Sequence, residues 1–200
     1  MEVLFTIFTA FGLSASTGLN AYIPLLVVSL LAKFTNLITL QSPWNALESW
    51  WTIGALIILS FVEFFADKFP AVNHVNDAIQ TFIRPAAGAI VFAASSNVIT
   101  DINPVVALIL GLLVSGSVHA TKSLAVRPAV TATTGGAGNI PISILEDILA
   151  TVVSIVAIIL PALIVGFTVL AIILAAYWIN LRQNRTRKVR NYSSLQRNKR

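Results

Sequence analysis

The sequence predicts an all-α protein, a polytopic bundle of five to six transmembrane helices. Hydrophobic residues make up 56% of the 200 residues and charged residues only 10%, whereas a soluble domain carries about 25% charged residues. Apolar stretches of the length that a bilayer requires, about 20 residues, recur along the chain. The chain contains no cysteine, which excludes disulfide scaffolds, thiol nucleophiles and thiolate metal sites. A soluble globular domain and a disordered chain are both excluded by this composition.

The first apolar stretch covers residues 3–32, which is long enough for one tilted spanning helix. Gly18, followed closely by Pro24, predicts a kink or a break in the middle of this stretch. The residues at 33–49 form a loop before the second span, which covers about 51–66. Tryptophans around this junction fit the aromatic belt of a membrane interface: Trp44, Trp50 and Trp51.

Residues 67–84 predict an amphipathic helix that lies at the membrane interface. They are too polar to cross a bilayer, yet apolar residues recur among them at helical spacing: Val72, Val75, Ile79 and Phe82. A short third span follows at about 85–99, where Gly88 and several alanines and serines would let helices approach closely.

The last part of the chain contains one clear span and one ambiguous apolar run. The fourth span covers about 105–126, and the residues at 128–141 lack regular periodicity and predict a loop. The final run at 142–179 would measure about 57 Å as one helix, which is too long for a simple span. Pro161 lies in its middle. The run therefore forms either two spans that turn near Pro161 or one long kinked helix.

The positive-inside rule favours six spans over five. With six spans and a cytoplasmic C-terminus, only Lys33 lies outside, and the other basic residues near span ends lie on the cytoplasmic side: Lys68, Arg84 and Arg127. Five spans would move these three residues outside. Six spans would also permit two inverted halves of three, a plan that is common among transporters.

The C-terminal residues 182–200 hold most of the basic residues of the chain and no acidic residue. We therefore expect residues 1–181 to form a single transmembrane domain and residues 182–200 to form a basic, disordered tail on the cytoplasmic side. Such a tail is attracted to anionic lipid headgroups. No folded nucleic-acid reader accompanies it, so no nucleic-acid partner is expected.

Ionisable residues gather near the ends of the predicted spans. The second-to-third and fourth-to-fifth connections lie on one side of the membrane under either span count, so these residues are expected at one membrane face. Charges there are costly unless they are paired or face water. The pattern predicts a polar site for an ion or a small charged solute, and ion pairs that hold helix ends are the alternative. The candidate binding residues are Asn20, Glu63, Asp67, Lys68, Arg84, His119, Lys122, Arg127, Glu146 and Asp147.

Glu63 and Asp67 are four residues apart and share a helix face, which indicates a shared proton or cation. Glu63 and Glu146 lie inside apolar runs, a position that favours function over ion pairing. His119 is either a hydrogen-bonded packing residue or a proton relay. A separate loop could hold an anion on its backbone N–H groups, or could be only a flexible connection. Its candidate residues are Thr133, Thr134, Gly135 and Gly136.

Other kinds of chemistry have no support in the sequence. The chain shows neither a Ser-His-Asp order nor a nucleophile elbow. Its two histidines have no metal-ligand spacing. The Thr-Gly loop lacks the Lys-Ser/Thr ending of a nucleotide-binding loop. We therefore expect no enzymatic activity, no cofactor and no metal site.

Three stretches of the chain resemble the uncharacterised membrane family "domain of unknown function 4126": GLNAYIPLLVVSLLAKF at 18–34, VEFFADKFPAVNHVNDAIQTFIRPAAGAI at 62–90 and HATKSLAVRPAVTATTGGAGNIPISILEDILA at 119–150. The resemblance implies a bacterial-type protein of the cell (inner) membrane. It implies no particular activity. The basic tail lies outside the resemblance.

Two functions follow from these features. The first is a small transporter or channel for an ion or a small charged solute, in which the charged cluster forms the site. A homodimer could complete the pathway. The second is a non-transporting membrane scaffold or lipid-organising protein that acts through its basic tail and its interfacial helix.

Overall fold

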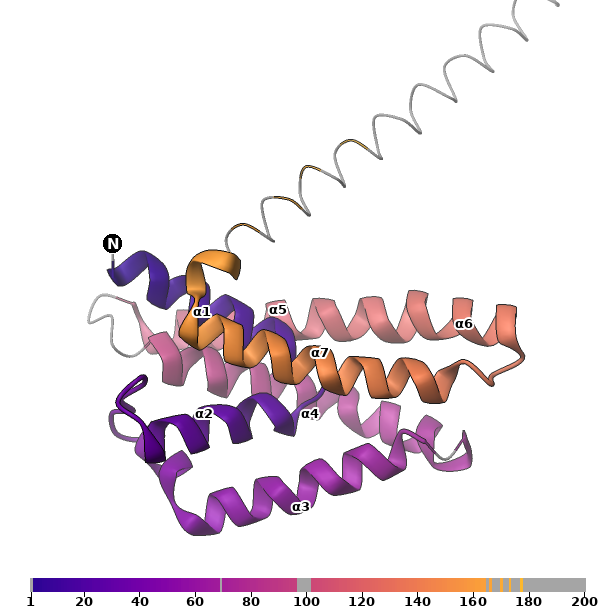
Figure 1. The fold of residues 1–200 in the computed structure, drawn as a ribbon, viewed down its shortest axis with the longest axis horizontal. Helices are drawn as coiled ribbons and strands as arrows, with labels where there is room; N and C mark the ends of the chain where they lie inside the picture. The colour runs from indigo at the N-terminus through magenta and orange to yellow at the C-terminus, as the bar shows by residue number, and fades with distance from the viewer. Residues whose placement is uncertain are drawn as a thin grey trace, which may run out of the picture. The chain divides into compact units, whose positions relative to one another are not determined.

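The computed structural model describes residues 2–68, 70–96 and 102–164, together with 166, 170, 173 and 177. Every regular element in this part of the chain is a helix (Figure 1). The chain divides into two units, Met1–Ala162 and Leu163–Arg200. The basic tail at 182–200 lies outside the described residues. All of the labelled helices belong to the first unit.

The first apolar stretch is a helix hairpin. Helix α1 (Glu2–Thr17) and helix α2 (Tyr22–Phe34) run in opposite directions in Figure 1. At 1.5 Å per residue, their 16 and 13 residues give lengths of about 24 and 20 Å, so each is shorter than a bilayer core of about 30 Å. The outer ends of the hairpin meet, because Phe5 and Leu37 line the same cavity of about 320 Å³. The break between Gly18 and Pro24 is confirmed, but the chain turns back there instead of continuing as one tilted span.

Helix α3 (Trp50–Ala66) follows a short 3₁₀ helix, η1 (Trp44–Glu48). The Ser49 hydroxyl caps α3 by accepting the backbone N–H of Thr52 at 3.1 Å. Such a cap satisfies one of the four free N–H groups at a helix start. The helix ends just before Asp67, which places the acidic end of the predicted second span beside α4.

Helix α4 (Pro70–Ser96) is continuous through Pro85, so the prediction of a separate interfacial helix at 67–84 is wrong. The apolar side of its first half faces outward, where Phe82 is 79% exposed, whereas Gln80 and Arg84 are buried. The amphipathic pattern predicts a polar face in water. The polar face instead meets the protein interior, and the apolar face is exposed on the outside of the bundle.

A 31-residue helical stretch, Pro104–Thr134, follows. It consists of α5 (Pro104–Thr121), the π-helical turn η2 (Lys122–Val126) and α6 (Arg127–Thr134). The loop predicted at 128–141 is therefore mostly helical. Gly135 ends the stretch at a φ of 62°, a left-handed conformation that glycine adopts readily.

Helix α7 (Asn139–Ile159) ends one residue before Leu160, which precedes Pro161. A residue before proline is driven out of the helical conformation, so the predicted interruption near Pro161 is confirmed. Most of the apolar run beyond it lies outside the described residues. Within the described ranges, three helical stretches are long and apolar enough to cross a membrane: Val75–Ser96, Pro104–Thr134 and Asn139–Ile159. Six spans and an inverted repeat stay predictions.

Helices α4 and α5 share the most extensive interface between two described helices. A Cβ atom added at Gly88 would lie 2.8 Å from Thr17 Oγ1 and 2.9 Å from the backbone oxygen of Gly111. Gly88 therefore permits a backbone approach that no larger residue allows. Beside this contact, the Phe92 ring packs edge-on against Phe11 at a centroid distance of 5.0 Å. The predicted role of Gly88 in close helix packing is confirmed.

Candidate functional site

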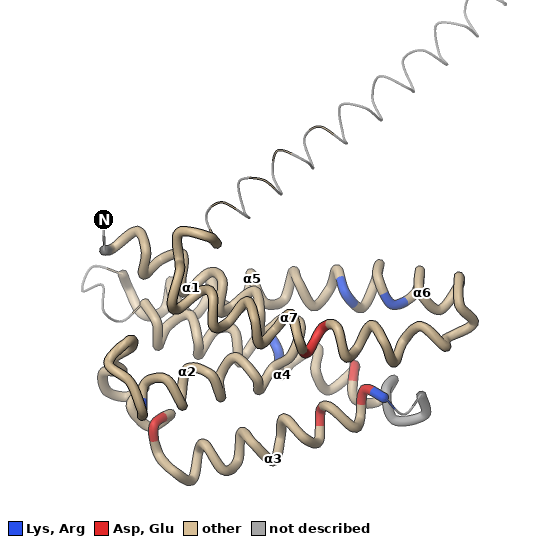
Figure 2. Tube along the Cα trace, viewed as in Figure 1, with Lys and Arg blue, Asp and Glu red and all other residues tan. Residues whose placement is uncertain are grey.

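Three short helices end at one place inside the bundle. Helix α1 ends at Thr17, α2 begins at Tyr22 and α3 ends at Ala66. Figure 2 shows that most charged positions of the described chain gather in this region, between α3, α4, α6 and α7. We call this set the ion network. It has five carboxylates and four cations in ion pairs of 2.8 to 3.9 Å: Glu63, Asp67, Asp77, Glu146, Asp147, Lys68, Arg84, Lys122 and Arg127.

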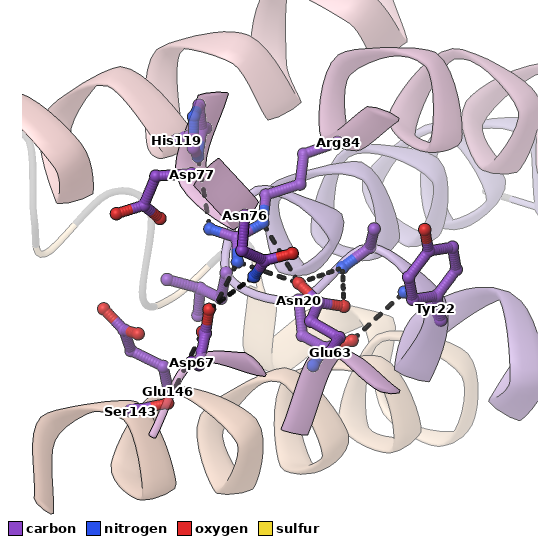
Figure 3. Close-up of polar contacts among 12 residues, drawn as sticks. Asn20, Tyr22, Glu63, Asp67, Asn76, Asp77, Arg84, His119, Ser143 and Glu146 are labelled. Carbon is purple, nitrogen blue, oxygen red and sulfur yellow. Dashed lines mark hydrogen bonds and ion pairs between the residues drawn. The ribbon is translucent and has the colours of Figure 1, made fainter. Parts of the chain in front are cut away.

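The most deeply buried pair joins α3 to α4. Arg84 is 0% exposed and Glu63 is 1% exposed. The guanidinium donates from Nη2 to Glu63 Oε1 at 2.8 Å and from Nε to the same oxygen at 3.2 Å (Figure 3). The other oxygen, Oε2, accepts the backbone N–H of Ala21 at 3.1 Å. Glu63 therefore places a negative charge at the start of α2, where the helix dipole is positive.

A positive charge lies on the α1 side of the hairpin tip. The Lys122 ammonium donates to the backbone oxygen of Leu19, just past the end of α1, at 2.9 Å. Asn20 completes the tip, because its Oδ1 accepts the backbone N–H groups of Tyr22 at 3.1 Å and Ile23 at 3.0 Å. The polar backbone groups that the break exposes are thus bound by side chains of the protein itself. A break in a membrane helix requires such partners.

Lys122 and Arg127 both reach the network because of the π turn between them. In an α-helix, residues five apart point about 140° away from each other. In η2 the backbone N–H of Arg127 donates to the backbone oxygen of Lys122, and this wider turn brings residues five apart toward one face. As a result, Lys122 lies 2.8 Å from Glu146 Oε2 and Arg127 lies 3.0 Å from Asp67 Oδ2.

Asp67 is the acid at the centre of the network. Its Oδ1 accepts a hydrogen bond from Asn76 Nδ2 at 2.7 Å. Burial raises the pKa of the Asp67 carboxyl, but nearby cations outweigh burial and hold the pKa below its ordinary value. These cations are Lys122, Arg127 and Arg84. Asp67 therefore carries a charge that the folded protein stabilises.

Asp147 and Lys68 form the looser edge of the network. Asp147 Oδ1 accepts a hydrogen bond from Asn20 at 2.9 Å. The second oxygen, Oδ2, is buried without a hydrogen-bond partner among the described residues, and the Lys68 ammonium lies 3.7 Å from it. One carboxylate oxygen is thus paired only at ion-pair distance.

His119 adds no charge to the network. Arg84 can only donate hydrogen bonds, so His119 Nδ1, which lies 3.2 Å from Arg84 Nη1, is the acceptor. The ring proton then sits on Nε2, which lies 3.2 Å from the Thr81 hydroxyl. Thr81 in turn donates to the backbone oxygen of Asp77 at 2.8 Å. A neutral, hydrogen-bonded histidine positions Arg84, and the network keeps one carboxylate in excess.

The structure brings together all ten binding candidates from the sequence, but part-way along the long helices and not at their ends. Lys122 and Glu146, for example, lie within the stretches Pro104–Thr134 and Asn139–Ile159. Sequence reasoning missed Asp77, whose carboxylate binds Arg127 Nη1 at 3.0 Å. It lies seven residues before Arg84, two helical turns away, and this spacing was the available signal. Asn76 and Ser143, which contact Asp67, were also missed.

The anion-loop candidates lie apart from the ion network. The Thr133 hydroxyl donates to the backbone oxygen of Ala129 at 2.9 Å, and the Thr134 hydroxyl donates to that of Val130 at 2.7 Å, both within α6. Gly135 and Gly136 form the exposed turn after α6, and the backbone N–H of Gly138 donates to the Thr134 hydroxyl at 3.0 Å. These contacts describe a capped helix end.

The fold and the site define a class: an all-helical protein with stretches long and apolar enough to cross a membrane and with a buried ion network at a helix-hairpin tip. The chain belongs to the family described as "Domain of unknown function (DUF4126)", which matches residues 7–181. This membership confirms the resemblance found in the sequence. Neither a curated protein nor a solved structure matches the chain.

Proposed function

We propose that the chain is a multi-pass protein of the cell membrane, with its tail in the cytoplasm, that binds an ion or a small charged solute at the ion network and carries it across. The observation that supports this proposal is the network itself, which has one excess carboxylate and surrounds the tip of a broken helix. Ionisable residues within a membrane are costly and typically mark solute or ion pathways. Broken helices that meet near the middle of a bundle are a common way to build a transport site.

The charge balance indicates which kind of solute the network accepts. With Glu63, Asp67 and Glu146 set against Arg84, Lys122 and Arg127, the interior is neutral. Asp147 and Lys68 form a further pair, and Asp77 then remains as the excess carboxylate. The Asp77 side chain is partly buried, with 24% of its surface exposed, and an unbalanced charge that is partly removed from water is costly. A proton or a cation would neutralise the set, so the network favours positively charged solutes.

Glu146 is the residue on which the proposal is best tested. Replacing Glu146 by Gln removes one charge and keeps the shape of the side chain. We expect the Glu146→Gln variant to remain folded and to lose transport. Glu48→Gln is the matched control, because the contact of Glu48 with Lys33 uses its backbone oxygen and not its carboxylate.

The experiment uses full-length protein in detergent and in proteoliposomes. Melting temperatures are measured in sodium, potassium, ammonium, phosphate and acetate salts at matched ionic strength, and with organic cations. A ligand at 100 times its dissociation constant stabilises the native state by about 2.7 kcal/mol. A shift in wild type and Glu48→Gln that disappears in folded Glu146→Gln, together with solute-dependent currents, supports the proposal. The absence of any shift or current, or unfolding of Glu146→Gln, contradicts it.

The alternative function is a scaffold that acts through a basic tail and an interfacial helix, and the described residues contain no separate helix at 67–84 to serve as the second of these. The helical segment expected at the interface is the first half of α4, and its polar side chains bind the ion network. Deleting residues 182–200 tests what remains. Lipid or partner association that survives this deletion contradicts the tail-based scaffold.

A further inference from the structure

An apolar groove between α5–η2 and α7 leads to the ion network. It has a volume of about 370 Å³, which is within the usual range of 300–1,000 Å³ for small-molecule sites. Six aliphatic residues and two hydroxyl residues form its walls: Leu19, Val118, Val126, Ile142, Leu145 and Leu149, with Ser117 and Thr121. Lys122 and Glu146 also line it, so the groove meets the network at their ion pair.

Glu146 can exchange its partner without leaving a buried cation unpaired. Its Oε2 binds Lys122 at 2.8 Å and Arg127 at 3.4 Å. Both cations have other partners, because Lys122 donates to the backbone oxygen of Leu19 at 2.9 Å and Arg127 lies 3.0 Å from Asp67. If Glu146 turned toward a ligand in the groove, neither cation would be left without an acceptor.

The chemistry of the ligand follows from the walls and the charge. A small hydrated ion would lose its water on entering and find aliphatic side chains in exchange, which is unfavourable. An anion would face a network that already has one excess carboxylate. A cation that carries its own apolar surface avoids both penalties, since its body replaces lipid in the groove and its charge balances the network.

We propose that this groove binds an organic cation with an apolar body, whose charge pairs with Glu146. The inference rests on the proposed function, because it names the substrate class of the same site. The bound cation lies against Leu145 and Leu149, one helical turn apart on α7, with Glu146 between them in sequence. This arrangement resembles an ordinary ligand pocket in which apolar contacts supply area and one charged residue sets specificity.

The first test compares two probes of the same shape and opposite charge. Tetraphenylphosphonium is expected to raise the melting temperature of the full-length protein and to bind saturably. Tetraphenylborate, which has the same apolar body, is expected to give no stabilisation. Tetramethylammonium, which has the charge without the body, is expected to bind at least tenfold more weakly. Equal stabilisation by tetraphenylborate, or equal binding of tetramethylammonium, overturns the proposal.

The second test fills the groove without touching a charge. Leu145→Trp should weaken tetraphenylphosphonium binding at least tenfold. Ile148→Trp is the matched control, because Ile148 is an exposed residue of α7 outside the groove lining. This variant should bind tetraphenylphosphonium with the wild-type affinity. If Leu145→Trp does not fold, Leu149→Trp takes its place. If a folded groove variant binds tetraphenylphosphonium with the wild-type affinity, the cation binds elsewhere on the protein, and the proposal is overturned.

The outcomes separate this inference from the proposed function. If tetraphenylphosphonium binds in a way that depends on Glu146 and Leu145, but no solute gives a flux above that of Glu146→Gln proteoliposomes, the binding site is supported and transport is contradicted. If ammonium or potassium gives stabilisation and flux that depend on Glu146, but tetraphenylphosphonium does not bind, the proposed transport function is supported and the organic-cation inference is contradicted.

Discussion

The carboxylate of Glu63 accepts the backbone N–H of Ala21 at 3.1 Å while it also binds the fully buried guanidinium of Arg84. One side chain thus fixes the start of α2 to the middle of α4. The hairpin tip and the ion network are therefore a single structural unit. Any change that removes this carboxylate should affect both.

Glu63→Gln should destabilise the protein strongly. The substitution leaves the buried Arg84 without its charged partner, and breaking a buried ion pair in this way costs about 3–5 kcal/mol. Thermal or chemical unfolding of the purified protein measures the effect. Glu48→Gln serves as the control and should unfold like wild type. A Glu63→Gln variant as stable as this control would show that Arg84 does not depend on Glu63.

Gly88→Ala should loosen the contact between α4 and α5. The new methyl group would lie against Ser115 and 2.8 Å from Thr17 Oγ1, and overpacking of this kind costs about 1–3 kcal/mol.

Gly54→Ala is the matched substitution in α3, because a Cβ at Gly54 meets no atom within 4 Å. It should be neutral or stabilise by up to about 1 kcal/mol, since alanine favours the helix. Melting temperatures that fall equally in the two glycine variants would contradict the close-packing interpretation.

Acid should destabilise the protein through Asp67. Its pKa is lower in the folded state than in the unfolded state, so the stabilisation is present above the ordinary pKa of about 4 and is lost as pH falls through the folded value. The melting temperature of wild type should therefore fall below about pH 4. The Asp67→Asn variant should have a lower melting temperature at neutral pH, and its melting temperature should fall less steeply as the pH is lowered. An equally steep fall in the variant would assign the acid sensitivity to other carboxylates.

Deleting Leu124 should replace the π turn with a regular α-helical turn and leave the ion network in place. Lys122 and Arg127 would then be four residues apart, about 40° around the helix, so both would still face the acids. Inserting one alanine after Leu124 should instead place them six residues apart, about 240° around the helix, and turn Arg127 away from Asp67 and Asp77. Leu124 is 78% exposed, so neither change removes much packing, and only the insertion should lower the melting temperature strongly. Equal melting temperatures of the two variants would mean that the register of this turn does not position Arg127.

The sequence predicts the helices and the meeting of charged residues well, for one physical reason. Apolar runs must cross or pack, and a charge inside such a run is costly unless it is paired or faces water, which predicts that the charged residues meet. For Glu63 and Glu146 the sequence favours function over ion pairing, whereas the structure pairs Glu63 with Arg84 and Glu146 with Lys122. Asp77 was missed because its helix face was assigned to water. A polar face has the same period whether it meets water or a protein interior.

Two further features had no decisive signal in the sequence. Gly18 and Pro24 indicate that a helix breaks, but they do not determine whether the chain continues or returns, because that depends on packing against distant helices such as α4 and α7. The π turn at Lys122–Val126 lacks a local signature. It is maintained by the contacts that Lys122 and Arg127 make with distant acids.

The helix hairpin also constrains the order in which the protein can be assembled. The hydroxyl of Thr9 donates to Ala157, 148 residues later in the chain, and Asn20 donates to Asp147, 127 residues later. The hairpin is synthesised first, yet its polar groups find these partners only when α7 has been made. We infer that the nascent chain holds an incomplete hairpin throughout most of its synthesis. Completion of α7 is then the step that closes the bundle around it.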